Sequence, residues 1–314
     1  MRHTISIAMT TFNGERFLRE QLDSIYSQTL LPDEVVVCDD NSSDGTIGIL
    51  EEYKQKYGLK YYINNPGLGV NDNFYKTISL CTSDYIALCD QDDVWLQNKI
   101  EITYNKLLEI DDGMPAVVSS LCHDIDADGN YINKEKDILD SFGVQATLLT
   151  SCRSQGCSLM MNRQLSEFIL SIKDSDIRIK NIMFDVFISF VAAIVGHKYN
   201  LGNRLMLYRH HDNNVIAKYN IKKRSIKERL NLQNRYVGFI PDQRFEILKI
   251  IKKVLSKNIE NKDVVLFLDK IISIGESNLI LGIIKILLFP YISFTQKLSI
   301  CVKSVILGAF KLFL

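Results

Sequence analysis

The first ninety residues alternate between short apolar runs and stretches with helical periodicity, and this alternation limits the possible folds more than any other feature of the chain. The apolar run 34–38 is typical of a strand that is buried on both faces of a sheet. Strands are expected at residues 5–9, 34–38, 60–63 and 85–89, and helices at residues 15–27, 45–57 and 70–81. This β-α-β-α-β-α-β order predicts a mostly parallel α/β sheet with helices on its faces.

Polar clusters follow three of these predicted strands. They occupy residues 10–13 after the first strand, 39–41 after the second and 90–93 after the fourth. Ligands of parallel α/β sheets bind outside the carboxyl ends of the strands. We therefore expect the three clusters to lie together and to form one site.

The rest of the chain is less regular. Strands are expected at residues 116–121, 157–161 and 204–208, an apolar helix at 182–195, and helices beyond residue 217. We expect a catalytic domain over residues 1–215 and a basic, apolar helical region over residues 216–314. Its most apolar part, residues 279–314, is interrupted by Lys285 and Pro290, which leaves less than the roughly 20 residues of a membrane-spanning helix. Helices lying on a membrane surface and an ordinary packed subdomain both remain open.

The distribution of charge narrows the function further. The net charge is formally zero, so nothing indicates a nucleic-acid partner. Residues 217–314 hold 18 Lys and Arg against 7 Asp and Glu, so the tail suits an anionic lipid surface, or is a solvated helical face. The acidic remainder suits a metal ion. Seven cysteines without CxxC spacing, and an amino end in which no signal peptide is recognised, indicate the reducing cytoplasm.

Three carboxylates stand within four residues after the fourth predicted strand, at Asp90, Asp92 and Asp93. They repel one another unless a cation neutralises them, and oxygen ligands select a hard ion such as Mg²⁺ or Mn²⁺. The spacing of Asp90 and Asp92 puts both on one side of an extended segment. Asp93 is also expected to cap a helix that follows it, and a solvated loop is the alternative for the whole cluster.

The cluster after the second predicted strand holds two adjacent acids, Asp39 and Asp40. A carboxylate at this edge can accept the imide N–H of a pyrimidine base or bind ribose hydroxyls. Thr10 and Thr11, at the end of the first strand, can add hydroxyl contacts, and Phe12 offers a ring face for stacking. These residues predict a nucleotide site beside the metal site.

Five segments together resemble the family 2 glycosyltransferases, which have the GT-A fold. They are Thr-Thr-Phe-Asn-Gly-Glu at 10–15, Leu-Asp-Ser-Ile-Tyr-Ser-Gln-Thr at 22–29, the run 33–46, Asn-Pro-Gly-Leu-Gly at 65–69 and Asp-Gln-Asp-Asp-Val-Trp at 90–95. The resemblance covers about the first 215 residues. It implies a Rossmann-like central sheet flanked by helices, with the tail as a helical extension.

The resemblance also implies roles for single residues. Asp90 and Asp92 would hold Mn²⁺ or Mg²⁺ on the donor diphosphate, and Asp40 would contact the nucleoside. Asp185 would be the general base, although Phe184 and Val186 depart from the His or Glu and the Trp that flank this acid in relatives. The remaining donor-nucleotide contacts are expected from Thr10, Thr11, Phe12, Asn13 and Asp90.

Two later segments complete the expected site. The run 207–214 is similar to the family's Tyr-Arg-x-His segment, in which Arg209 and His211 would close over the diphosphate or complete the metal shell. Gly156 and Cys157 resemble a loop on the acceptor side, where Trp95 is also expected.

The resemblance implies an inverting, metal-dependent transfer of a sugar from a nucleotide-diphosphate donor to a saccharide or lipid-linked acceptor. The pattern is most similar to bacterial enzymes that build surface polysaccharides, including rhamnosyltransferases, and implies peripheral attachment to the inner face of the cell membrane. A nucleotidyltransferase is disfavoured because the first loop has only Gly14 and Arg16 to hold a triphosphate. A degenerate scaffold is disfavoured because both the acidic motif and the base are present.

Overall fold

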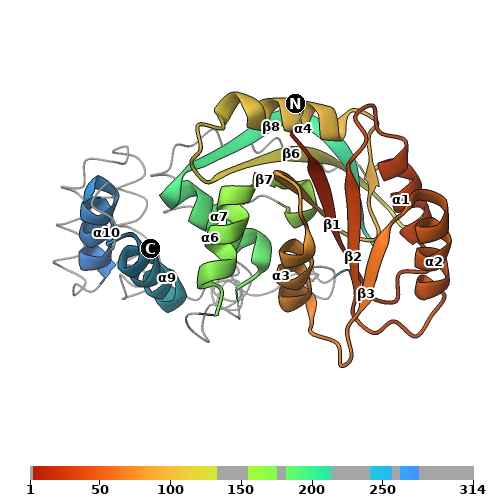
Figure 1. The fold of residues 1–314 in the computed structure, drawn as a ribbon, viewed down its shortest axis with the longest axis horizontal. Coiled ribbons are helices and arrows are strands. Elements are labelled where there is room, and N and C mark those ends of the chain that lie inside the picture. The colour runs from red at the N-terminus through yellow and green to blue at the C-terminus, as the bar shows by residue number, and fades with distance from the viewer. Residues whose placement is uncertain are drawn as a thin grey trace. The chain divides into compact units, whose positions relative to one another are not determined.

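The computed structural model describes residues 3–132, 155–174, 182–212, 214, 241–256 and 262–275. The chain divides into two compact units, each of which is described by itself below. The first comprises Met1–Ser141, Ser154–Leu170 and Gly196–Ile221, and the second comprises Phe142–Arg153, Ser171–Val195 and Lys222–Leu314. Figure 1 shows the helices and strands, most of them labelled.

The first unit begins with the alternation that the sequence predicts. The elements are β1 (Ile5–Thr11), α1 (Leu18–Tyr26), β2 (Glu34–Asp39), α2 (Thr46–Tyr57), β3 (Lys60–Ile63), α3 (Val70–Leu80) and β4 (Tyr85–Cys89). The four strands are parallel, with β1 between β2 and β4. Helix α1 begins three residues later than expected, because Phe17 and Leu18 both donate their backbone N–H to the carbonyl of Gly14 in a turn.

Four further strands extend this sheet from β4. They are β5 (Val94–Trp95), β6 (Ala116–Ile125), β7 (Met160–Asn162) and β8 (His197–Arg209), and the order is β3-β2-β1-β4-β7-β6-β8-β5. Strand β7 is antiparallel to both of its neighbours, and β5 is antiparallel to β8. Since β6 and β8 are parallel, four of the seven pairings in this mixed sheet are parallel.

Two local predictions in this unit are wrong. The expected strand at 157–161 is a single 3₁₀ turn at Gly156–Ser158 followed by the short β7. The helix expected directly after Asp93 begins only at Lys99, with Asn98 at its N-cap, and runs to Ile110 as α4. The chain stays extended after Asp93 because Val94 and Trp95 pair with β8. Asp93 therefore caps no helix.

The core follows the period-two pattern of the central strands. Ile5, Ile7 and Met9 point to one face of the sheet and pack with side chains of α1, α2 and α4. The alternate residues point to the other face, where α3 packs against β1 and β2 and buries Phe74 and Ile78. Both faces are apolar, so the polar groups of the central strands concentrate at the strand ends.

Hydrogen bonds to Glu34 link the amino ends of the central parallel strands. The side chain of Glu34 is only 7% exposed. Its carboxylate accepts hydrogen bonds from Ser6 Oγ at 2.5 Å and from the backbone N–H of Thr82 at 2.6 Å. Lys60 Nζ lies 2.8 Å from the second oxygen. Burial works to raise the pKa of Glu34, but the hydrogen bonds from Lys60, Ser6 and Thr82 outweigh it and lower the pKa to about 2.

We expect Glu34→Gln to lower the free energy of unfolding at neutral pH by about 2 kcal/mol, the typical loss for a charged hydrogen-bonded group. A depressed pKa contributes stability above the unfolded value of 4.5, and that stability is lost as the pH falls toward 2. Urea unfolding at several pH values should therefore show wild type and variant converging in acid. The control is Glu109→Gln, which removes an exposed partner of Lys106; equal stability of wild type and Glu34→Gln at pH 7 would refute the assignment.

The second unit is helical where it is described. It contains α7 (Phe184–Val195), α9 (Pro241–Leu255) and α10 (Lys262–Gly275), and α9 packs against α10. The apolar helix expected at 182–195 is confirmed as α7, whereas residues 279–314 lie outside the described part of the chain. Helix α6 (Arg163–Ile172) runs from the first unit into the second. Among the described helices, none is long and apolar enough to cross a membrane.

Candidate functional site

The loops after β1 and β2 are joined by hydrogen bonds at the carboxyl edge of the sheet. Asn13 has a positive φ of 48°, and its Oδ1 accepts the backbone N–H of Ser43 at 2.9 Å. The backbone N–H of Asn13 donates to Ser42 Oγ at 2.8 Å, and that of Gly14 donates to Thr46 Oγ1 at 2.8 Å. Asn13 thus sets the path of the loop after β1 and bonds it to the loop after β2.

Gln91, which the sequence analysis did not single out, holds the first loop against the acidic loop after β4. Its Oε1 accepts the backbone N–H of Phe12 at 2.8 Å, and its Nε2 donates to the carbonyl of Phe12 at 3.0 Å. A Cβ at Gly14 would lie 2.2 Å from Gln91 Oε1, so a side chain at this position would displace the Gln91 amide. The Phe12 side chain is 56% exposed and remains available for stacking.

Thr11 and Asp39 bind each other, which corrects the expected role of Thr11. Thr11 is 2% exposed, and its hydroxyl donates to Asp39 Oδ2 at 2.7 Å. The fully buried Asp39 also accepts from the backbone N–H and the hydroxyl of Ser42, at 2.8 and 2.6 Å. Neither side chain is accessible to a nucleotide. Thr10, on the opposite face of β1, is only half-buried.

Asp40 holds the segment that follows β3. Its Oδ1 accepts the backbone N–H of Leu68 at 2.6 Å and Asn64 Nδ2 at 3.0 Å, and its Oδ2 accepts the N–H of Gly69 at 2.8 Å. A carboxylate has about four acceptor positions, so roughly one of them stays open at Asp40. The half-buried carboxylate can still accept one hydrogen bond from a ligand.

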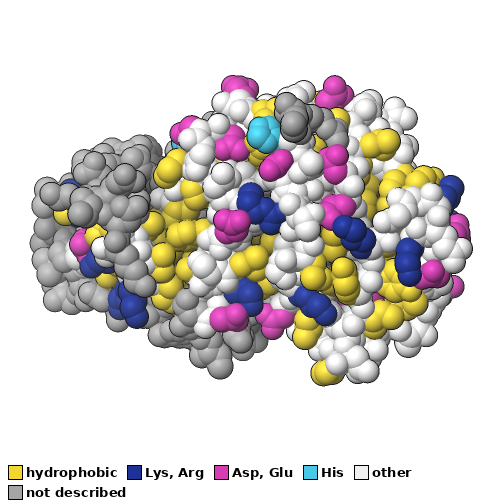
Figure 2. All heavy atoms as spheres, in the orientation of Figure 1, with side chains coloured by type: hydrophobic (Ala, Val, Ile, Leu, Met, Phe, Trp, Pro, Cys, Tyr) yellow, Lys and Arg dark blue, Asp and Glu magenta, His cyan; other side chains and the backbone are white. Residues whose placement is uncertain are grey.

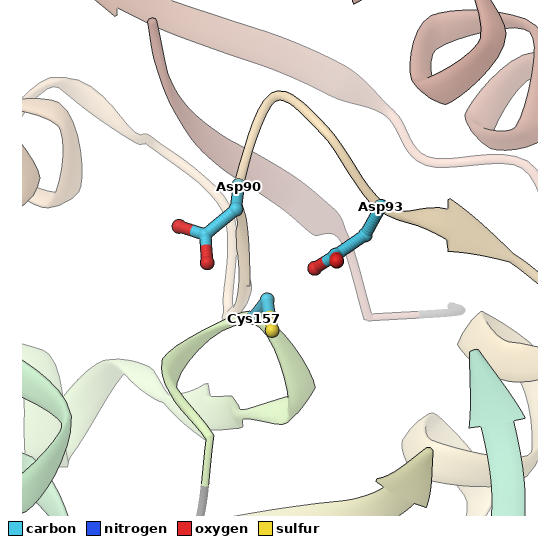
Figure 3. Close-up of side chains that lie close together, drawn as sticks. All are labelled: Asp90, Asp93 and Cys157. Carbon is cyan, nitrogen blue, oxygen red and sulfur yellow. The ribbon is translucent and has the colours of Figure 1, made fainter. Parts of the chain in front are cut away.

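The acidic loop after β4 contains a compact group of possible metal-binding atoms. Figure 3 shows Asp90 and Asp93 on this loop, with Cys157 reaching toward them from the 3₁₀ turn. One ligand atom from each of the three lies within 4.8 Å of the others. Cys157 is 1% exposed, and burial raises the pKa of its thiol well above the usual value. Asp90 is half-buried whereas Asp93 and Cys157 are buried, so Asp90 is the most accessible of the three groups.

Asp93 and Lys99 are fully buried beneath this loop. Burial and the charge of Asp92 raise the pKa of Asp93 to about 7, and burial lowers the pKa of Lys99 to about 8. Among the described residues, neither Asp93 Oδ2 nor Lys99 Nζ has a hydrogen-bond partner. Lys99 Nζ instead lies 4.1 Å from the centre of the Trp95 ring. The hydrogen bonds of the acidic loop thus compensate only part of the negative charge of its carboxylates.

His211 contacts Asp92 of the acidic loop. His211 Nε2 lies 2.8 Å from Asp92 Oδ2, and the two side chains are 11% and 15% exposed. The other His of this segment, His210, bonds to Asp124 instead, with 2.6 Å between Nε2 and Oδ1. The structure therefore brings together Asp92 and His211, two residues to which the resemblance gives a role at the metal ion.

Arg209 departs from its expected place over a diphosphate. Its side chain is 3% exposed, and its Nη2 lies 2.6 Å from Glu20 Oε2. Its Nε donates to the backbone carbonyl of Asp92 at 2.9 Å. The guanidinium is thus buried and engaged by the protein itself. Its position corrects the prediction of a donor contact and leaves Arg209 as a support of the acidic loop.

The residues expected on the acceptor side are also buried. Trp95, which is expected on the acceptor side, is instead 3% exposed in the hydrophobic core, because its strand β5 pairs with β8. Gly156 and Cys157 lie buried in the 3₁₀ turn. Cys157 lies next to Asp93, and Gly156 is the first residue of the turn. Neither presents a surface to an acceptor.

Asp185 lies in the second unit, in the first turn of α7. It is half-buried, as is Val186 beside it, whereas Phe184 and Phe187 are buried. Its Oδ1 accepts the backbone N–H of Val186 at 2.7 Å. The position at the start of a helix matches the one expected for the general base.

The family of the chain follows from comparison with known proteins. Residues 6–167 match the profile described as "Glycosyl transferase family 2", which is more than half of the chain. The chain belongs to this family and is a glycosyltransferase. The match spans the loops after β1, β2 and β4, which carry the site described above.

Two relatives whose names state an activity are similar in sequence. The "dTDP-rhamnosyl transferase RfbG" of Shigella flexneri is 28% identical over 239 residues, which are 71% of this chain and 78% of that enzyme. A glucosyltransferase of Escherichia coli, WfgD, is 29% identical over 107 residues, or 34% of this chain and 42% of that enzyme. Its name gives UDP-Glc as donor and an α-D-GlcNAc-diphosphoundecaprenol acceptor.

Solved structures support the fold alone. Staphylococcus aureus TarS, in a structure of residues 1–349 with UDP-GlcNAc, aligns with a TM-score of 0.56 at 14% identity. The alignment covers 98% of this chain and 92% of that chain. The GT-A fold that the sequence resemblance implied is confirmed, with the mixed curled sheet described above.

Proposed function

We propose that the chain is an inverting, metal-dependent glycosyltransferase that moves a sugar from a nucleotide-diphosphate donor to a saccharide or lipid-linked acceptor. The observation that carries this proposal is the loop after β4. It carries Asp90 and Asp92, His211 Nε2 lies 2.8 Å from Asp92 Oδ2, and Gln91 holds the loop after β1 against it through Phe12.

The chemistry of the donor set suits a divalent cation. Asp90 and Asp92 supply carboxylate oxygens and His211 supplies an imidazole nitrogen, which together fit Mn²⁺ or Mg²⁺. Asp93, which is fully buried close by and has no hydrogen-bond partner for its Oδ2 among the described residues, is a further acid beside this set. When bound, such an ion would neutralise charge on the diphosphate leaving group. Asp90, Asp92 and His211 are the residues that would hold it.

The donor side is formed by the loops after β1 and β2. We propose that the exposed ring of Phe12 stacks on the base and that the remaining acceptor position of Asp40 binds the nucleoside. Thr10, half-buried at the end of β1, contributes a hydroxyl, and Asn13 sets the path of the loop. The similarity to RfbG supports a dTDP-linked donor with rhamnose as the sugar, and the similarity to WfgD supports UDP-glucose as the donor.

The acceptor hydroxyl is activated by Asp185 in this proposal. The carboxylate takes the hydroxyl proton while the oxygen attacks the anomeric carbon, and the nucleoside diphosphate leaves from the opposite face. The bond to the diphosphate breaks as the new glycosidic bond forms, so the configuration inverts. The lipid-diphosphate-linked acceptor in the name of WfgD supports an acceptor of the same kind in polysaccharide synthesis.

A donor panel tests this function directly. Purified full-length protein would be incubated with Mn²⁺ and, in turn, dTDP-rhamnose, UDP-glucose, UDP-N-acetylglucosamine and GDP-mannose, and release of the nucleoside diphosphate would be measured. We expect one donor to be hydrolysed slowly without acceptor and faster with a lipid-linked N-acetylglucosamine diphosphate. A folded protein that hydrolyses none of them in either condition would contradict the proposal and favour a degenerate scaffold.

The second unit is proposed to bring the enzyme to an anionic membrane surface at the inner face of the cell membrane. A hollow of about 450 Å³ between α9 and α10 is lined by Lys249, Lys252, Lys253, Ser256, Asp269, Ile272 and Ser273. Three lysines face one carboxylate, and Asp269 pairs with Lys252. This excess of positive charge suits lipid phosphate groups.

We expect Lys249→Gln/Lys252→Gln/Lys253→Gln to weaken sedimentation of the full-length protein with anionic phospholipid vesicles by roughly tenfold or more, since each lysine near such a surface adds about 1 kcal/mol. The matched control is Lys54→Gln/Lys56→Gln, which removes exposed lysines of α2 in the first unit. Figure 2 shows acidic and basic side chains interspersed over the coloured face. Equal vesicle binding by wild type and the triple variant would rule out this role for the hollow.

A further inference from the structure

Helix α1 carries a carboxylate that the proposed mechanism does not use. The Glu20 side chain is 57% exposed, yet its Oε2 lies 2.6 Å from Nη2 of Arg209, which is 3% exposed. The two residues are 189 positions apart in the chain. A buried guanidinium needs an anionic partner, and Glu20 provides it from the surface.

Arg209, held in place by Glu20, also bonds to the acidic loop. Its Nε donates to the backbone carbonyl of Asp92 at 2.9 Å, and its backbone N–H donates to Asp93 Oδ1 at 3.1 Å. Arg209 Nη1 also reaches the carbonyl of Ala127 at 3.4 Å. Because the guanidinium is planar and its donors point in fixed directions, the Glu20 contact sets the direction of the bond to Asp92.

The ring of Phe17, one turn before Glu20 on the chain, contacts both Arg209 and His211. Its ring centre lies 4.8 Å from Cζ of Arg209 and 4.9 Å from the ring centre of His211. The two rings are inclined at 39°. The amino end of α1 therefore supports the Arg209 guanidinium and the His211 imidazole together.

The backbone between Arg209 and His211 is held by Asn214. Asn214 Nδ2 donates to the carbonyl of Arg209 at 2.7 Å, and Asn214 Oδ1 accepts the backbone N–H of His211 at 2.7 Å. A shift of Arg209 is thus transmitted to His211, whose Nε2 lies 2.8 Å from Asp92 Oδ2.

We propose that Glu20 and Phe17 are positioning residues that set the affinity of the Asp92–His211 pair for a divalent cation. They hold Arg209 between α1 and the acidic loop, so that the carboxylate and the imidazole are already placed before the ion binds. Partners of this kind typically change metal affinity by about 10- to 100-fold. This inference rests on the proposed function, because it assigns Asp92 and His211 to a metal ion.

The test compares Mn²⁺ affinity, measured by electron paramagnetic resonance on the full-length protein with and without dTDP, for Glu20→Gln and Glu20→Ala. We expect Mn²⁺ binding to weaken by about tenfold in Glu20→Ala and by less in Glu20→Gln, whose amide oxygen can still accept from Arg209. The matched controls are Glu52→Gln and Glu52→Ala. They remove the partner of Arg19, the residue before Glu20 on the same helix, from an ion pair in which both side chains are 50% exposed.

Two further readouts separate positioning from a general loss of structure. Glu20→Ala should lower the thermal midpoint more than Glu52→Ala does, because the buried Arg209 loses its anionic partner, but it should stay folded at the assay temperature, and kcat should recover at saturating Mn²⁺. Wild-type Mn²⁺ affinity in Glu20→Ala would overturn the inference and leave the proposed function standing. A wild-type protein that binds no Mn²⁺ under either condition would overturn both.

Discussion

Replacing Asp185 with Asn should lower kcat by about a thousandfold while the donor still binds, because a general base contributes about 10²- to 10⁴-fold to the rate. The amide has nearly the same shape as the carboxylate and can still accept the backbone N–H of Val186, so α7 should keep its first turn. The measurement is steady-state transfer with varied donor concentration. The KM for the donor should stay within about threefold, since the base acts on the acceptor.

A matched control isolates the chemistry of Asp185. Asp72 is an exposed acid in the first turn of α3, and Asp72→Asn changes the charge of the protein by the same amount. We expect this variant to be as active as wild type. Full activity of Asp185→Asn would remove the residue from the mechanism and direct the search for the base elsewhere in the chain.

Replacing Asp92 with Asn should lower kcat/KM for the donor by roughly a thousandfold, which corresponds to about 4 kcal/mol of lost transition-state stabilisation. Asn can still bond to His211, and the change relieves the repulsion between Asp92 and the buried Asp93. The thermal midpoint should therefore be unchanged or higher. Activity measured against Mn²⁺ concentration should show a much weaker dependence on the ion than in wild type.

A second Asp–His pair in the same unit serves as the control for Asp92. Asp112 Oδ2 lies 3.1 Å from Nε2 of His197, at the opposite end of β8 from His211. Asp112→Asn removes the same charge from the same kind of pair, and it should leave both kcat/KM and the Mn²⁺ dependence unchanged. A similar loss in both variants would show that charge alone explains the effect, and the metal assignment of Asp92 would then be wrong.

Local patterns predicted the first half of the fold and indicated two acids of the candidate site. Strands β1 to β4 could be read from apolar runs, because burial on both faces of a parallel sheet leaves a mark in each strand separately. Asp90 and Asp92 were visible for the same reason, since they follow a buried strand directly. His211 was found only through the family resemblance, as a histidine in a polar segment has no distinctive local pattern.

Residues whose place depends on distant segments could not be predicted. Trp95 is buried because β5 pairs with β8, and nothing near Trp95 in the sequence indicates that pairing. Asp93 is drawn into the interior by the same extended segment and by the backbone N–H of Arg209. Glu20 lies on an ordinary exposed position of α1, and only the folded chain shows its contact with Arg209.

Calorimetric titration of the full-length protein with dTDP, UDP, GDP and CMP, each with and without Mn²⁺, tests whether Asp92 binds a nucleotide through a divalent cation. We expect that one nucleotide binds, that binding requires Mn²⁺, and that Asp92→Ala abolishes it while Asp112→Ala does not. Binding of no nucleotide by a folded wild-type protein, or binding that is the same with and without Mn²⁺, would show that the metal-dependent donor site is wrong.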